Sequence, residues 1–255
     1  MFEALKRWRR RRVLERQRIP DELWEGAVAK LPFLGRYGPD EMARLRDWVV
    51  LFLHAKSIVG VGGFEPTPFA RVLIAVQACV LILHLDLDYY RGWESVLVYR
   101  GEFVTDFEWE DDAGVVHRVR SPVAGESMPQ GPVILSWADV EASTDWKRAG
   151  MNLVIHEFAH KLDMLGGAGS GRPPLHPGMS PSEWAEAFDA AYASFCKRVD
   201  RGVATRIDPY AAEAPDEFFA VCSEVFFAEP KLLKRQYPAL YRQLALFYRQ
   251  DMLAA

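Results

Sequence analysis

The segment "NLVIHEFAHKLDML", residues 152–165, constrains the fold of this chain more than any other. Its apolar residues recur at helical spacing, which predicts a helix packed into the core. The same segment carries His156, Glu157 and His160. Residues four apart on a helix lie on one face, so the two imidazoles can reach one metal ion. Glu157 lies about 100° round the helix from His156, where its carboxylate can reach a water on that ion but cannot comfortably ligate it.

The H-E-x-x-H order predicts a catalytic zinc site. Zinc in such sites takes three protein ligands and leaves a fourth position for water, whose pKa it lowers towards neutrality. We expect Glu157 to take the proton of that water as it attacks a carbonyl group. The alternative is two solvent-facing histidines that share a spacing by chance. Val154 and Ile155, which precede the motif, favour the buried site.

The third ligand is expected on a helix further along the chain. No histidine follows in an H-x-x-G-x-x-H pattern, and His176 lies in the Gly/Pro-rich surface loop 166–181. The segment "APDEFFAVCSEVFFAEP", residues 214–230, predicts an apolar helix with Glu217 and Glu224 on one face. Carboxylates on so apolar a helix need a cation or hydrogen-bond donors. Glu217 is therefore the predicted ligand, and Glu224 either accepts a hydrogen bond from a ligand histidine or pairs with an arginine.

Two more residues stand at informative spacings. Asp163, seven residues after His156, either orients a metal ligand from behind or caps the end of the helix. Tyr210, seven residues before Glu217, either packs in its loop or donates a hydrogen bond to the oxyanion of a tetrahedral intermediate. The residue pattern alone leaves both pairs of roles open.

The remaining chain predicts an α+β fold, mainly helical, with a small mixed sheet next to the zinc helix. Residues 21–59 and the chain after residue 137 have helical periodicity. The short segments between them are rich in β-branched and aromatic residues and predict strands and hairpins: "ESVLVYR", "EFVTDFEWED", "VVHRVRSPVAGES" and "GPVILSW". We expect a basic, helical arm at residues 1–19, which is a solvated helix end or a partly disordered tail rather than a segment bound to phosphates or a membrane. We expect a single domain at residues 20–255.

Charge, termini and cysteines narrow the class of protein. A formal charge of −4 and a pI of about 5.9 argue against a protein built to bind nucleic acid. The basic N-terminus lacks the apolar run of a signal peptide, and the longest apolar stretch, 72–83, is too short to span a bilayer. Three scattered cysteines predict buried free thiols in a reducing compartment: Cys79, Cys196 and Cys222. We therefore expect a soluble, cytoplasmic protein.

Several long motifs resemble one known family. The segments "NLVIHEFAHKLDM", "DPYAAEAPDEFFAVCSEVFF", "YPALYRQLALFYRQDM", "FEPTPFARVLIAVQACVLIL" and "GPVILSW" resemble the Mlc titration factor A family of bacterial zinc peptidases. The match runs from about residue 20 to the C-terminus. The catalytic region of that family is similar to the peptidase domain of anthrax lethal factor, which implies a gluzincin-like site with one zinc ion per chain.

The resemblance implies a role for each site residue. His156, His160 and Glu217 would be the zinc ligands and Glu157 the general base. Tyr210 occupies the place of a tyrosine that assists catalysis in lethal factor. Family members resemble aminopeptidases in activity, and the enterobacterial ones bind the glucose-regulatory repressor Mlc, although no motif here identifies a repressor contact.

The predicted function is therefore a zinc metallopeptidase of aminopeptidase type that acts on a peptide or protein substrate. The strand "GPVILSW" either pairs at a sheet edge with an extended substrate or is an ordinary strand. One alternative is a regulatory protein that sequesters a transcriptional repressor and has a structural or vestigial zinc site. Another is a metal-dependent hydrolase of a non-peptide amide. Glu157 favours an enzyme, because a purely structural site needs no general base. No carboxylate that would hold a substrate amine can be named from sequence.

Overall fold

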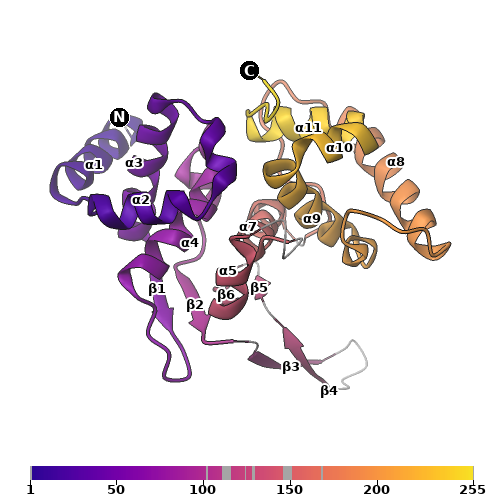
Figure 1. The fold of residues 1–255 in the computed structure, drawn as a ribbon, viewed down its shortest axis with the longest axis horizontal. Helices are drawn as coiled ribbons and strands as arrows, with labels where there is room; N and C mark the ends of the chain where they lie inside the picture. Colours follow the sequence, from indigo (N-terminus) through magenta and orange to yellow (C-terminus); the bar gives the residue numbers. More distant parts are fainter. Residues whose placement is uncertain are drawn as a thin grey trace.

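The computed structural model describes residues 2–101, 103–110, 116–123, 125–127, 130–145, 151–167 and 169–254. Helices occupy both ends of the chain and a small sheet lies between them (Figure 1). This confirms the prediction of a mainly helical protein with a small mixed sheet next to the histidine helix. None of the described helices is both long and apolar enough to cross a membrane.

The N-terminal half contributes four helices: α1 (Phe2–Arg16), α2 (Asp21–Ala29), α3 (Pro39–Ala55) and α4 (Pro68–Leu81). Proline at the first position starts both α3 and α4, and the Thr67 hydroxyl caps α4 by accepting from the N–H of Ala70. Residues 72–83 are all buried, so the longest apolar stretch forms the central core helix of this half. Short 3-10 turns, η1 (Pro32–Arg36) and η2 (Leu87–Tyr90), complete it.

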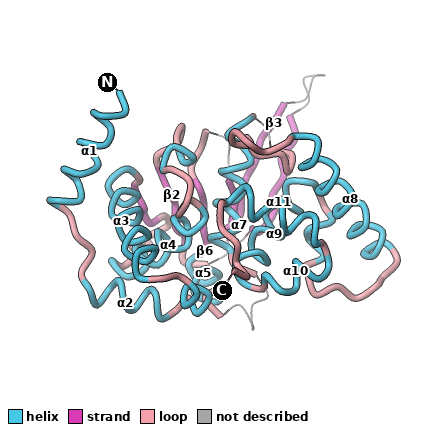
Figure 2. The backbone as a smooth tube through the Cα atoms, turned by 90° about the horizontal axis from the view of Figure 1, so that it is seen from above, coloured by secondary structure: helices cyan, strands magenta, loops and turns pink. Residues whose placement is uncertain are grey.

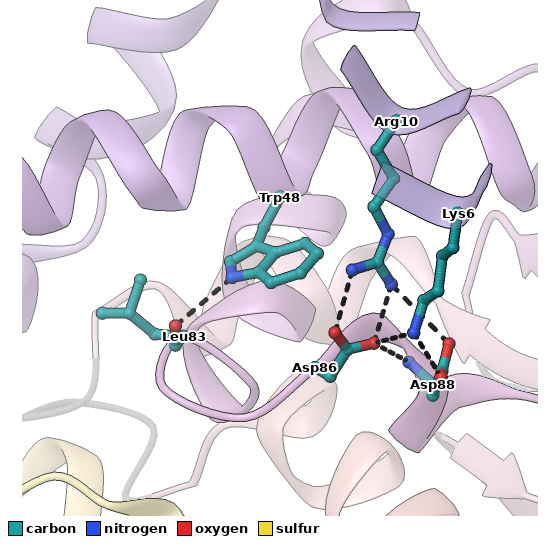
Figure 3. A network of polar contacts seen from close by, with 6 residues as sticks. All are labelled: Lys6, Arg10, Trp48, Leu83, Asp86 and Asp88. Atoms are coloured by element: carbon teal, nitrogen blue, oxygen red, sulfur yellow. Dashed lines mark hydrogen bonds and ion pairs between the residues drawn. The ribbon is translucent and has the colours of Figure 1, made fainter. Parts of the chain in front are cut away.

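The first helix is anchored to the body along one face (Figure 3). Arg10 and Lys6 donate to the carboxylate of Asp86, and the Arg10 guanidinium lies 5.0 Å from the centre of the Trp48 ring. The Trp48 indole in turn donates to the carbonyl of Leu83 at 3.2 Å. The predicted helix is therefore present, but it is docked on the body and not a solvated end. The division of the chain at residues 19 and 20 stays a prediction.

The main sheet has four strands in the order β1 (Ser57–Gly60), β2 (Ser95–Tyr99), β6 (Val133–Ser136) and β5 (Gly125–Ser127). The first three are parallel, and β5 runs antiparallel to β6. A separate antiparallel pair, β3 (Phe103–Glu110) and β4 (Val116–Val123), extends away from the body (Figure 1). Strand β1 lies where the sequence predicts helix or turn, because its pairing with β2 prevails over the local pattern.

Of the two roles open for "GPVILSW", the structure gives the ordinary strand and not the edge strand. This segment forms β6, which is bonded to β2 on one side and to β5 on the other. The physical reason is that "VVHRVRSPVAGES" does not form one strand but divides into β4 and β5, and the three-residue β5 folds back along β6. The described edge next to the histidine helix is therefore β5.

The C-terminal half is helical: α5 (Trp137–Ser143), α7 (Leu153–Asp163), α8 (Pro181–Asp200), α9 (Pro215–Ala228), α10 (Pro230–Gln236) and α11 (Pro238–Tyr248), with the turns η3 (Met164–Gly166) and η4 (Pro209–Ala212). Helix α7 lies between α4 and α9 and also contacts β5 and β6 (Figures 1 and 2). The three cysteines are unpaired thiols, two buried and Cys196 only partly so. The motif helix is thus enclosed by both halves of the chain.

Candidate metal centre

Helix α7 begins at a cap that ties it to two other helices. The Asn152 side chain accepts from the N–H of Ile155 at 2.9 Å, which starts the helix. Its amide donates to the carboxamide oxygen of Gln77 in α4 at 2.7 Å, and its backbone N–H donates to Glu224 in α9. All eleven residues of α7 are buried. Buried polar side chains need hydrogen-bond or ionic partners, and the two histidines of α7 find theirs in α9.

Three ligand atoms converge between α7 and α9. The Nε2 atoms of His156 and His160 are 3.1 Å apart, and they lie 3.0 and 3.4 Å from Oε2 of Glu217. These three residues form a group able to hold a metal ion. A tetrahedral ion with bonds of about 2.0–2.1 Å separates its ligand atoms by about 3.3 Å. The observed distances are close to that spacing.

The donor set fits a cation on chemical grounds as well. Oε2 of Glu217 is buried, and no described donor meets it in hydrogen-bonding geometry although both imidazoles are near. Burial raises the pKa of Glu217, but the two histidines outweigh burial and hold this pKa far below its ordinary value. Burial lowers the pKa of His156, but Glu217 and Glu224 outweigh it and raise this pKa well above the usual range. The cluster therefore stabilises positive charge at its centre.

Glu224 lies behind His156 and orients it. The Nδ1 atom of His156 is 2.7 Å from Oε1 of Glu224, whose side chain is buried. A carboxylate on Nδ1 keeps the proton there, so the lone pair of Nε2 points to the cluster. Of the two roles open for Glu224, the structure gives acceptance from the histidine and not a pair with an arginine.

Glu157 lies beside the cluster, against strand β5. It is 4% exposed, and its Oε2 has no described hydrogen-bond partner. Burial raises the pKa of Glu157, and the nearby histidines partly offset this. The Ser127 hydroxyl donates to the backbone carbonyl of Glu157 at 2.9 Å. Gly125 leaves the room for its carboxylate, because a Cβ there would lie 2.8 Å from Cδ of Glu157.

Tyr210 faces the cluster from turn η4. Its ring centre is 6.2 Å from that of His156, and its side chain is 52% exposed. The Asp208 side chain accepts from the N–H of Tyr210 at 2.9 Å and so caps the turn. Burial, followed by the charge of Glu217, raises the pKa of Tyr210 to about 12. The phenol is therefore a protonated donor at neutral pH.

The other sequence candidates have different surroundings. Asp163 accepts from the N–H groups of Ser170 and Gly171 at 2.6 and 2.7 Å, so it holds the following loop against α7. That role matches neither predicted alternative. His176 lies within 2.9 Å of the carbonyl of Leu246, outside the metal-binding group found among the described residues.

Sequence reasoning missed some of the supporting residues. Gln77 is the polar interruption in an apolar helix, and its contact with Asn152 explains why it is tolerated in the core. Asn152 directly before an apolar helix is a detectable cap signal. Gly125 and Ser127 carry no such signal, because their roles depend on contacts about thirty residues away.

Comparison with known proteins agrees with this geometry. Residues 5–249 match the family described as glucose-regulated metallo-peptidase M90. Proteins called Mlc titration factor A are similar along most of their length. The one from Klebsiella pneumoniae (strain 342) is 40% identical over 232 residues, which cover 90% of this chain and 86% of the relative. The Escherichia fergusonii protein has the same identity and coverage, and the Salmonella gallinarum protein is 39% identical over 246 residues, 96% of this chain and 91% of the relative.

Proposed function

The chain belongs to the glucose-regulated metallopeptidase M90 family, and on that basis we propose that it is a zinc-dependent aminopeptidase with His156, His160 and Glu217 as the metal ligands. The observation that carries the proposal is the convergence of three ligand atoms at 3.0–3.4 Å on a buried H-E-x-x-H helix. Two histidines and a carboxylate are a ligand set of catalytic zinc in hydrolases, with one ion per chain.

A bound zinc ion would polarise the scissile carbonyl and lower the pKa of a water molecule towards neutrality. The protein must then move protons, and Glu157 is the group placed for it. Its Oε2 is buried and without a described partner, so it can accept the proton of the attacking water and later deliver it to the departing amine. Burial, which raises the pKa of Glu157, makes its carboxylate a better base.

Tyr210 and strand β5 would act on the substrate. The phenol of Tyr210, protonated at neutral pH, would donate a hydrogen bond to the oxyanion as the carbonyl becomes tetrahedral. Strand β5 has β6 on one side and no described strand on the other. An extended peptide can add to that edge by main-chain hydrogen bonds. Because Gly125 of β5 lies against Glu157, such a peptide would pass next to the base.

Glu213 is our candidate for the group that holds a free substrate amine. Its backbone N–H donates to the carbonyl of Tyr210 at 3.0 Å, and side chains three apart in a 3-10 turn lie on one face. Its charge contributes to the raised pKa of Tyr210, together with those of Glu217 and Glu157. Glu217 is already assigned as a metal ligand and Glu157 as the base, which leaves Glu213 without a role. The Glu213 side chain is exposed, and no hydrogen bond or ion pair joins its carboxylate to a described residue.

Two comparisons test these assignments. Glu157→Gln should keep zinc and the melting temperature but lose about 10²–10⁴-fold in peptide hydrolysis; activity near that of the wild type would refute the mechanism. Glu213→Gln should lose activity on a peptide with a free amino terminus much more than on its N-acetylated form. An unchanged preference between the two peptides would remove Glu213 and leave the zinc chemistry intact.

The names of the relatives favour a second function. Proteins called Mlc titration factor A are 39–40% identical to this chain over most of its length. We propose that this chain also binds a repressor protein of the Mlc type. Purified repressor should co-elute with both the wild type and Glu157→Gln. Failure of both to bind it would refute this second function without affecting the first.

A further inference from the structure

Helix α1 differs in charge from the chain as a whole. This helix holds seven of the 31 Lys and Arg residues and two of the 35 acidic ones, so it carries +5 in a chain of −4. It also holds two of the six large apolar side chains that are exposed in the described part, Leu5 at 45% and Trp8 at 54%. Cationic and apolar groups are thus exposed together on one helix.

The polar contacts of the opposite face fix the orientation of the helix (Figure 3). The Arg10 guanidinium donates to the two carboxylate oxygens of Asp86 at 2.8 and 2.7 Å. Lys6, one turn earlier, donates to Asp86 at 3.1 Å and pairs with Asp88. A bidentate pair of this kind holds both position and direction. The face that carries Lys6 and Arg10 is therefore turned to the body.

Trp8 lies on the far side of the helix from these contacts. It is two residues from both Lys6 and Arg10, which places it about 160° round the helix from each. Leu5 is three residues before Trp8 and so lies next to it. Exposed arginines flank this apolar ridge, and none forms an ion pair with a described residue: Arg7, Arg9, Arg12 and Arg16. The Arg12 guanidinium is 5.2 Å from the centre of the Trp8 ring.

The location of α1 suits contact with a large flat partner. Figures 1 and 2 both place α1 at one end of the molecule and α8 at the opposite end. Its 15 residues make a helix about 22 Å long. A flat partner that approached the outward face of α1 would contact this end of the molecule before the rest.

We propose that α1 docks the protein on the surface of an anionic phospholipid bilayer. Trp8 and Leu5 would enter the headgroup region, where tryptophan is favoured, and the flanking arginines would contact lipid phosphates, which guanidinium groups bind well. Binding to a bilayer surface strengthens with the apolar area that enters it and with the attraction of cationic side chains to anionic lipids, and this face offers both. Nucleic acid would satisfy the arginines but gives no reason for an exposed leucine beside the tryptophan. Contact through one short helix makes the binding reversible.

Sedimentation of the full chain with vesicles tests the proposal. The wild type should bind vesicles of phosphatidylglycerol and phosphatidylcholine and should not bind phosphatidylcholine alone. Each arginine near an anionic surface is worth about a five-fold change in partitioning, so Arg7→Gln/Arg9→Gln/Arg12→Gln should lose on the order of 100-fold. Glutamine is a good helix former, so α1 should persist, which circular dichroism checks.

A matched variant separates this surface from net charge. Arg201→Gln/Lys231→Gln/Arg235→Gln also removes three exposed positive charges, all outside α1, and should bind anionic vesicles like the wild type. Trp8→Ser should weaken binding without changing its dependence on salt. Equal losses in the two triple variants would overturn the proposal, as would failure of the wild type to bind anionic vesicles. Tight binding to a DNA duplex at the same salt, with no binding to vesicles, would assign this face to nucleic acid instead.

Discussion

Replacing Gly125 with alanine should disable the site without touching a metal ligand. Gly125 has no positive φ, so alanine can adopt its backbone conformation and the effect is steric. The added Cβ would lie 2.7 Å from Cδ1 of Leu153 and 2.8 Å from Cδ of Glu157. Carbon atoms in contact prefer about 3.5–4.0 Å, so strand and carboxylate must separate by about 1 Å.

The expected magnitude follows from this displacement. A catalytic group misplaced by about 1 Å can cost on the order of 10²-fold in rate, so kcat should fall by about that factor. Overpacking of this kind costs about 1–3 kcal/mol, and a chain of this size loses about 2–4 °C in Tm per kcal/mol. Zinc content should stay unchanged, because the three atoms nearest to the new methyl group belong to Glu157 and Leu153 and none belongs to a proposed ligand.

The assay combines peptide hydrolysis, metal analysis and thermal melting for Gly125→Ala. Gly35→Ala is the matched control, since a Cβ at Gly35 meets no atom within 4 Å. Wild-type kcat and Tm in Gly125→Ala would refute the close approach of β5 to Glu157. Loss of zinc would show instead that the substitution disturbs the ligands, and the base would not be the cause.

Three further predictions concern other contacts. Glu224→Gln weakens the partner of His156 Nδ1, so zinc affinity measured by chelator competition should fall about 10–100-fold; unchanged affinity would contradict the orienting role. Tyr210→Phe should lower kcat by about 10²–10³-fold with KM, zinc and Tm nearly unchanged; an effect on KM alone would make Tyr210 a binding residue. Burial raises the pKa of Asp86, but Arg10 and the other donors outweigh burial and depress this pKa. The Asp86 carboxylate therefore stabilises the folded protein above the unfolded pKa near 3.9, and this stabilisation is lost as the pH falls below it. The Tm difference between wild type and Asp86→Asn should be constant above about pH 5 and shrink below about pH 4. A difference that grows in acid would contradict the depressed pKa of Asp86.

The sequence predicted the parts of the site that depend on helix geometry. His156, Glu157 and His160 sit on one helical turn, so their arrangement follows from local spacing. Glu217 required one further step, since a carboxylate on an apolar helix needs a partner. The acceptor role of Glu224 was one of two alternatives, and only the fold chooses between them.

Other features depend on long-range contacts that no local pattern encodes. Strand β1 is a four-residue strand that pairs with β2 almost forty residues later. Strand β5 takes the edge position that was one of two alternatives for β6, because its three residues pair along that strand. Glycine is required at position 125 only because β5 packs against α7, where a Cβ would meet Glu157 and Leu153. The docked face of α1 likewise depends on Asp86, far along the chain, while a run of arginines alone suggests a solvated arm.

The most direct test of the metal centre is the zinc content of Glu217→Ala beside that of the wild type and Glu224→Ala, each measured on folded protein after dialysis against a weak chelator. One zinc ion per wild-type chain is predicted, with little or none retained by Glu217→Ala and an intermediate amount by Glu224→Ala. A full complement of zinc in Glu217→Ala, with loss confined to Glu224→Ala, would contradict the assignment and move the third ligand two turns along α9.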